Sequence, residues 1–145
     1  MLLISHRGNL HGRKINSENH PEYVKIALRS NFEVEVDLIG HAGRLYLAHD
    51  PGLMRWENIV DEKFLDNPHL FVHCKNHEAL SFFNSRSMAC HHFYHSIDNF
   101  TVTSKGLAIA HSSQGAQKKT ICMLPELHGL SKESVEGCSG VCSDM

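Results

Sequence analysis

The sequence has no apolar run near the roughly 18 residues that a membrane-spanning helix needs. Its first seven residues contain only a short apolar stretch, and no basic segment precedes it, so they do not resemble a signal peptide. These absences predict a cytoplasmic protein that does not insert into a membrane.

An excess of charge of one sign is also missing. Lys and Arg number 14 against 16 Asp and Glu, the formal net charge is −2, and no long run of either sign occurs. Binding to a nucleic-acid backbone requires a concentrated basic face. Nucleic acid is therefore not an expected partner.

The cysteines do not form a recognisable framework. There are five, an odd number, and Cys138 and Cys142 are spaced too widely for a CxxC redox motif. Without an export signal this pattern predicts reduced thiols. Internal repeats and low-complexity linkers are absent too, and 145 residues suit one domain, so we expect residues 1–145 to form a single domain.

Hydrophobic periodicity predicts strands alternating with helices in the first half of the chain and mainly strands in the second. The predicted strands are residues 2–5, 32–39, 44–48, 69–74, 92–95, 100–103, 107–111 and 120–124, the last two flanking a Gly/Ser/Gln loop. The predicted helices are residues 21–30, 57–65, a helix capped by Asn76, and residues 131–136. Alternating strands and helices indicate parallel β-α-β units, and hence an α/β fold.

Residues 32–39 alternate between apolar side chains and the acids Glu33, Glu35 and Asp37. An exposed strand would place these acids in water, whereas a barrel strand would place them inside the mouth of the barrel. Alternation alone favours the exposed strand. The neighbouring motifs favour the barrel strand.

Those motifs include histidines, of which the chain has 13. Most are interpreted as surface residues, but His6, His49 and His73 each stand at the end of a predicted strand. Histidine is suited to accept or donate protons near neutral pH, so His6 and His49 are candidates for an acid and a base.

Charged residues suited to a phosphate and a metal accompany these histidines. Glu35 and Asp37 are two apart on one strand, so they face the same way and both offer oxygen to a hard cation such as Mg²⁺ or Ca²⁺. Arg7 has a planar fork that fits phosphate oxygens, and Lys75 adds positive charge.

Four motifs in order carry a family resemblance: His6-Arg7-Gly8, Glu18-Asn19, Glu35-Val36-Asp37 and His49-Asp50-Pro51. This series resembles the opening of the glycerophosphodiester phosphodiesterase family, within the phospholipase-C-like phosphodiesterase superfamily. The resemblance covers residues 4–55, with thinner similarity at residues 70–75 and 139–144. The last of these segments is similar to the family's final strand, which commonly ends in a Ser-Asp or Thr-Asp pair.

The resemblance implies an abbreviated TIM-like (β/α) barrel with a strand-rich second half, and metal-dependent hydrolysis of a small phosphodiester, an activity of lipid metabolism. It implies that His6 and His49 are the catalytic acid and base. Glu35 and Asp37 would be metal ligands, and Arg7 and Lys75 would bind the substrate. Glu18 and Asn19 would support the loop around His6.

The chain departs from the family at His73-Cys74-Lys75, where members usually read Glu-Ile-Lys. Lys75 is retained, but His73 replaces the third carboxylate. As a nitrogen ligand, His73 would shift the metal from Mg²⁺ or Ca²⁺ toward Mn²⁺, Fe²⁺ or Zn²⁺. Alternatively, it is a supporting or core residue. Glu126 is interpreted either as an additional carboxylate at the mouth or as an exposed loop residue.

The length sets further alternatives, because a complete eight-stranded barrel takes about 250 residues. Either shorter elements close the barrel, or it is open and completed by a second copy in a homodimer. A non-catalytic phosphate- or metal-binding protein, and a lyase that forms a cyclic phosphate, are the alternative functions. The sequence does not indicate the alcohol portion of the substrate.

Overall fold

The chain forms one strongly curved sheet, seen in a computed structural model that describes residues 1–112 and 117–144. Within those ranges the sheet has ten strands. They are β1 (Leu2–His6), β2 (Glu33–His41), β3 (Arg44–Leu47), β4 (Ile59–Val60), β5 (Leu70–Cys74), β6 (His91–Tyr94), β7 (Phe100–Val102), β8 (Ala108–Ala110), β9 (Thr120–Met123) and β10 (Gly140–Ser143).

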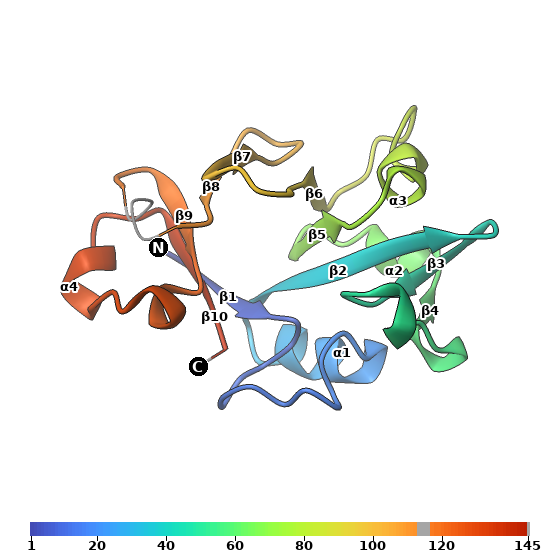
Figure 1. Cartoon of the computed structure of the whole chain (residues 1–145), viewed down its shortest axis with the longest axis horizontal. Coiled ribbons are helices and arrows are strands. Elements are labelled where there is room, and N and C mark those ends of the chain that lie inside the picture. Colours follow the sequence, from blue (N-terminus) through green and yellow to red (C-terminus); the bar gives the residue numbers. More distant parts are fainter. Residues whose placement is uncertain (113–116, 145) are drawn as a thin grey trace.

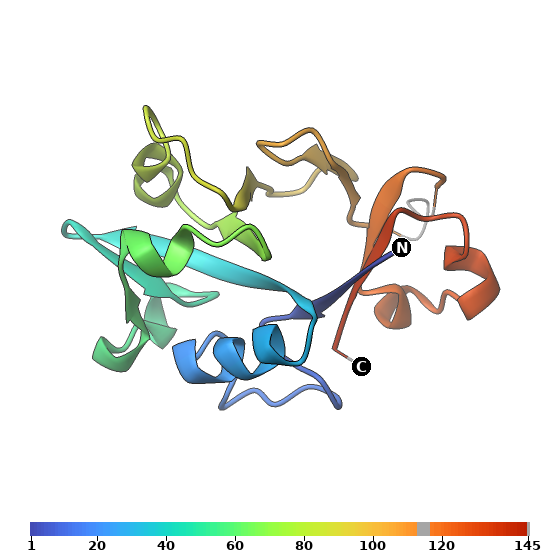
Figure 2. The same ribbon diagram turned by 180° about the vertical axis from the view of Figure 1, so that it is seen from behind.

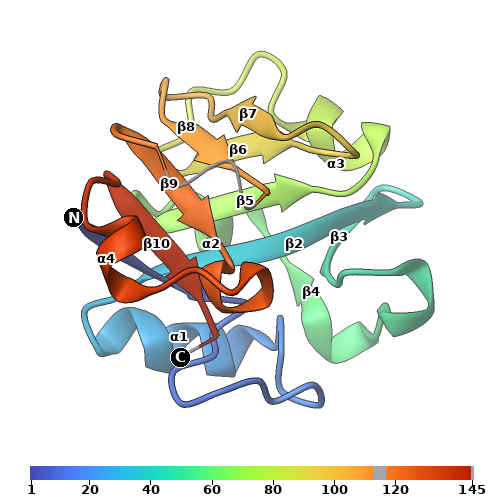
Figure 3. The same cartoon turned by 60° about the vertical axis from the view of Figure 1, so that its left-hand side comes forward.

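Seven of these strands run parallel, in the spatial order β6-β5-β2-β1-β10-β9-β8. β3, β4 and β7 extend the sheet by antiparallel pairing. In Figure 3, β5 and β2 run side by side and end toward the same side of the molecule. The carboxyl ends of the parallel strands therefore gather at one end of the sheet, where ligands commonly bind in α/β proteins.

The curvature brings the two ends of the sheet together, so that the strands surround an interior (Figure 1). At the seam, the Ser104 backbone N–H donates to the His92 carbonyl at 2.8 Å, and Thr101 Oγ1 donates to the Tyr94 carbonyl at 3.0 Å. The buried interior is formed by Ile4, Phe71, Phe93, Ile109, Ile121, Met123 and Cys142. The seam leaves less open edge for a second copy to cover, and the homodimer stays a prediction.

The helices are α1 (Pro21–Arg29), α2 (Glu62–Leu65), α3 (His77–Phe82) and α4 (Lys132–Val135), with the 3₁₀ segments η1 (Pro51–Leu53), η2 (Trp56–Asn58) and η4 (Pro125–His128). α1, α2 and α3 cover the outer face of β2 and β5, whereas α4 packs against β9 through Val135 and Cys122. Seen from behind, α1 lies along β1 and β2 (Figure 2). Val24 and Ala27 of α1 pack into a second core with Val34 and Val36 of β2. None of the helices in the described ranges has the length and apolar character that crossing a membrane requires.

The predicted TIM-like (β/α) barrel is wrong, because the sheet is mixed and few helices cover it. Parallel neighbours need a crossover of a dozen or more residues, whereas shorter links produce hairpins. Ala42 and Gly43, with φ of 50° and 74°, make the two-residue turn between β2 and β3. Residues 103–107 likewise join β7 to β8 as an antiparallel pair.

The other predicted elements mostly appear close to their expected bounds. Residues 57–65 are an exception, since a single helix was expected and η2, β4 and α2 are found. There Ile59–Val60 pairs with β3, and Asp61 then caps a new helix by accepting from the Phe64 N–H. The expected Gly/Ser/Gln loop includes residues 113–116, which lie outside the described residues.

Candidate functional site

Three neighbouring strands bring the predicted site residues together. His6, the last residue of β1, pairs with Glu35 of β2, and Asp37 of β2 pairs with His73 of β5. Glu35 and Asp37 are only 2% and 1% exposed. The acids of residues 32–39 that carry the predicted chemistry thus lie inside the molecule, as the motifs indicated and against the exposed-strand alternative.

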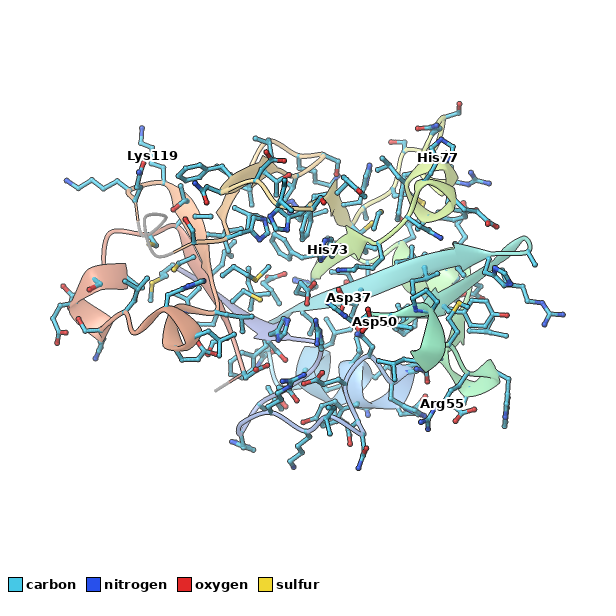
Figure 4. All side chains as sticks on the ribbon, in the orientation of Figure 1. Asp37, Asp50, Arg55, His73, His77 and Lys119 are labelled. Carbon is cyan, nitrogen blue, oxygen red and sulfur yellow. The ribbon has the colours of Figure 1, made fainter. Side chains whose placement is uncertain are left out.

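Glu35, Asp37 and His73 form a cluster that could hold a metal ion, with one ligand atom from each lying within 4.8 Å of the others. His73 Nδ1 is 3.4 Å from Asp37 Oδ1 and 3.8 Å from Glu35 Oε1 (Figure 4). Glu35 Oε2 and Asp37 Oδ1 are buried and accept no hydrogen bond from the described residues. Burying a carboxylate oxygen without a hydrogen-bond donor is unfavourable. A bound cation would compensate the charge on both of these oxygens. This donor set fits a divalent ion.

The loop after β1 holds Asp37 in place. Asn19 donates from Nδ2 to Asp37 Oδ2 at 2.9 Å and accepts the Asp37 backbone N–H at 2.9 Å. Arg7 Nε lies 2.7 Å from Asp37 Oδ2, and an η-nitrogen of Arg7 donates to Glu18 at 3.0 Å. Much of the Arg7 fork is therefore engaged by carboxylates, and its predicted phosphate contact stays a prediction.

Gly8 is required by the shape of this same loop. Its φ is +88°, a conformation that L side chains rarely adopt. A Cβ on Gly8 would also lie 3.0 Å from Tyr23 Cδ1. The glycine of the His6-Arg7-Gly8 motif lets the loop turn back against α1.

The two carboxyl groups of the cluster have opposite pKa shifts. Burial opposes ionisation of Asp37, but His73 and Arg7 together hold its pKa well below the usual range. Burial, with the neighbouring Asp37 charge, raises the pKa of Glu35. A bound cation would oppose the second effect by stabilising the ionised form of Glu35.

His6 is oriented by Asp144, which follows β10. His6 Nδ1 lies 2.8 Å from Asp144 Oδ1, and because a carboxylate only accepts, Nδ1 carries the hydrogen. His6 Nε2 then faces Glu35 Oε2 at 3.8 Å. Burial lowers the pKa of His6, but Asp144 and Glu35 outweigh burial, and the net shift is upward. Asn9 also donates to Asp144 at 2.8 Å.

His49 has a similar aspartate partner on the loop after β3. Its Nδ1 lies 2.8 Å from Asp50 Oδ2, so Nε2 is the nitrogen that does not contact Asp50. The Ala48 N–H donates to the Asp37 carbonyl at 3.0 Å and ties this loop to the cluster. His6, Arg7 and His49 line one cavity of about 630 Å³. The candidate acid and base thus face the same space.

Lys75 lies beside the cluster, with Nζ 3.8 Å from Asp37 Oδ1. It is not among the residues that line the cavity. Lys75 thus brings positive charge to the candidate metal ligands, which do not line the cavity either, and its contact with a substrate stays a prediction.

Sequence reasoning missed the roles of Asp144, Asn9 and Glu126. The Ser-Asp pair near the C-terminal end was the available signal for Asp144, but its partner His6 is 138 residues away. Glu126 is half-buried in η4, so its interpretation as an exposed loop residue is wrong, and its interpretation as a carboxylate at the mouth stays a prediction. Its Oε1 accepts the Ser143 hydroxyl and the Asp144 N–H, both at 3.0 Å, so Glu126 positions the segment that holds His6.

Comparison with protein-family models, curated proteins and solved structures found no match. The family resemblance therefore rests on the motif residues alone. Of the predicted site residues, the cluster Glu35, Asp37 and His73 lies beside His6 and Lys75. His49 shares the cavity with His6.

Proposed function

We propose that this protein is an enzyme that hydrolyses a phosphodiester with the aid of a divalent cation. One arrangement carries the proposal. Two histidines, each backed by an aspartate, line one cavity, beside buried carboxylate oxygens that lack donors.

The two histidines would move the protons. His6 donates its Nδ1–H to Asp144, and His49 donates its Nδ1–H to Asp50, so in each ring Nε2 is the nitrogen left to exchange a proton. An aspartate in this position orients the imidazole and stabilises its protonated form. One histidine takes a proton from water as the water oxygen bonds to phosphorus. The other gives a proton to the alkoxide as the old P–O bond breaks, which yields a phosphomonoester and an alcohol.

Glu35, Asp37 and His73 would hold the cation. When bound, the cation supplies electrostatic stabilisation of the charge that develops on the phosphate oxygens. Arg7 and Asn19 keep Asp37 ionised and fixed, so this ligand needs no rearrangement. Lys75 adds positive charge on the β5 side of the cluster.

Hydrolysis of bis(p-nitrophenyl) phosphate tests the proposal. The purified protein is assayed with EDTA and then with added Mg²⁺, Ca²⁺ or Mn²⁺, beside His6→Ala and His49→Ala. Turnover should require a metal and fall by about 10²-fold to 10⁴-fold in each variant, the contribution typical of acid–base catalysis. His77→Ala is the matched control, since His77 is exposed on α3, away from the cluster (Figure 4). Turnover insensitive to EDTA and to both variants would contradict the proposal.

Two further readouts separate the alternatives. A substrate with a neighbouring hydroxyl, followed by ³¹P NMR, distinguishes a phosphomonoester from the cyclic phosphate that a lyase would release. Binding of inorganic phosphate without turnover of any diester would favour the non-catalytic alternative.

A further inference from the structure

His73 presents one defined nitrogen to the two carboxylates. Its Nε2 lies 3.3 Å from the His95 backbone carbonyl, which can only accept, so a ring that binds a metal through Nδ1 would keep its hydrogen on Nε2 and donate it to this carbonyl. Nδ1 is the nitrogen that faces Asp37 and Glu35. Metal-binding histidines usually donate their other ring N–H to a carbonyl or carboxylate, which fixes both the tautomer and the orientation of the ring.

The plane of the His73 ring is fixed as well. Phe93 of β6 stacks on it, with centroids 4.9 Å apart and planes 12° apart. His95, which supplies the carbonyl, is held in turn. Its Nε2 donates to the Asp98 carbonyl at 2.6 Å, and its ring stacks on His111 at 3.5 Å. Phe93 on β6, His95 after β6 and His111 after β8 thus hold the His73 ring on β5 in one orientation before any metal binds.

His95 and His111 themselves are support residues rather than ligands. Their rings are 10° from parallel. Because an imidazole binds a metal in the plane of its ring, two stacked rings cannot both aim at one ion. Among the described residues, the only group of three or more candidate ligands is Glu35, Asp37 and His73.

We infer that this cluster is a transition-metal centre, in which His73 Nδ1 is a direct ligand and the His95 carbonyl orients it. Mg²⁺ and Ca²⁺ select oxygen ligands, whereas imidazole suits later ions such as Fe²⁺ and Zn²⁺. The inference rests on the metal site of the proposed function and adds the class of ion. It decides between the two interpretations of His73, as a ligand or as a supporting residue.

Metal titration of the EDTA-stripped protein tests this inference without relying on activity. Calorimetry with Mn²⁺, Zn²⁺, Mg²⁺ and Ca²⁺ should give transition ions an advantage in Kd of about tenfold or more. Co²⁺ should give visible bands of a site with a nitrogen ligand. His73→Gln keeps the side-chain length but removes the imidazole, so the advantage should fall by about tenfold or more and the Co²⁺ bands should shift.

The controls address the other histidines and the fold. His77→Ala should retain the wild-type preference, and circular dichroism checks that each variant is folded. His73→Glu is the second variant if His73→Gln does not fold, and it should move the preference toward Mg²⁺ and Ca²⁺. In the Zn²⁺-loaded protein, ¹⁵N NMR should show His73 with hydrogen on Nε2 and a zinc-shifted Nδ1.

The inference would be overturned if wild type and the folded His73 variants had the same ion preference. The ions would then be bound adventitiously, by surface histidines only. A His73 ring with hydrogen on Nδ1 in the loaded protein would overturn it too. The two proposals fail separately. Selective binding that depends on His73, without turnover of any diester, contradicts the enzyme alone. Metal-dependent turnover that is indifferent to His73 contradicts the transition-metal centre alone.

Discussion

At the scale of single residues, Glu18 links the loop after β1 to the site. Its carboxylate accepts from Arg7 at 3.0 Å, from Asn9 at 3.2 Å and from Arg13 at 3.0 Å. Arg7 contacts Asp37, and Asn9 contacts Asp144. Glu18 therefore joins Arg7, which contacts the candidate metal ligand Asp37, to Asn9, which contacts the partner of His6.

Glu18 gives a prediction for acid stability. Burial opposes its ionisation, but the three donors outweigh burial and lower its pKa. A carboxyl with a lowered folded-state pKa stabilises the fold above its unfolded pKa of about 4.3, and this stabilisation is lost as the pH falls through the folded pKa. In urea denaturation of the metal-free protein, Glu18→Gln should be less stable than wild type at pH 7. The difference should shrink below about pH 4.

Glu136→Gln is the control, because Glu136 is exposed at the end of α4. It should follow the wild-type pH profile. A constant difference between Glu18→Gln and wild type from pH 7 to 3 would show that the Glu18 carboxylate is not stabilised by its donors.

At the scale of elements, β2 and α3 approach so closely that only glycine fits between them. A Cβ on Gly40 would lie 2.7 Å from the Ala79 nitrogen. Asn76 then joins the two elements. It donates to the Gly40 carbonyl at 2.7 Å, and its Oδ1 accepts the N–H groups of Gly40 and Ala79 at 3.1 and 3.0 Å.

Replacing Asn76 removes a helix cap and a strand contact together. Asn76→Ala should lower the free energy of unfolding by about 2–3 kcal/mol, from a cap of about 1 kcal/mol and two hydrogen bonds of about the same size. Urea denaturation measures the loss. Asn84→Ala, at an exposed asparagine, is the control and should change stability by less than about 0.5 kcal/mol. Equal stability of the two variants would contradict the double role of Asn76.

Local chemistry identified most of the elements and much of the site. The alternation around Glu35 and Asp37 placed β2, and Asn76 marked the start of α3. The prediction of a helical barrel was wrong because it extended the family's architecture from the motifs of residues 4–55 to the rest of the chain. Several later connections between strands are too short to contain a helix. Residues 103–107 illustrate this, since their length allows only a hairpin.

At the scale of the whole molecule, residues from both ends of the chain complete the site. β1 lies between β2 and β10, so the segment after β10 reaches the end of β1. There Asp144 meets His6. No periodicity reveals such a pairing, because it depends on which strands become neighbours.

Under the proposed function, this pairing makes Asp144 the residue that positions His6. Asp144→Asn removes the charge that stabilises protonated His6, so the pKa of His6 should fall and turnover should drop by about 10²-fold or more. NMR titration of His6 in the metal-free protein, and kcat of the metal-loaded protein in the phosphodiester assay, measure the two effects. Glu133→Gln, an exposed loss of the same charge, is the control. An unchanged His6 titration in a folded Asp144→Asn protein would contradict the assignment.

The parallel pairing of β1 with β10 also governs when the protein can fold during synthesis. Leu2 aligns with Gly140 and Ser5 with Ser143, so these contacts join residues that are 138 positions apart in the sequence (140 − 2 and 143 − 5). Contacts of such long sequence separation slow folding, and ribosomes add about 5–20 residues per second. After β1 has been synthesised, its edge that pairs with β10 therefore stays unpaired for several seconds or more, until β10 has been made. During that interval the nascent chain, unlike the finished one, exposes the central strand of its sheet to other chains.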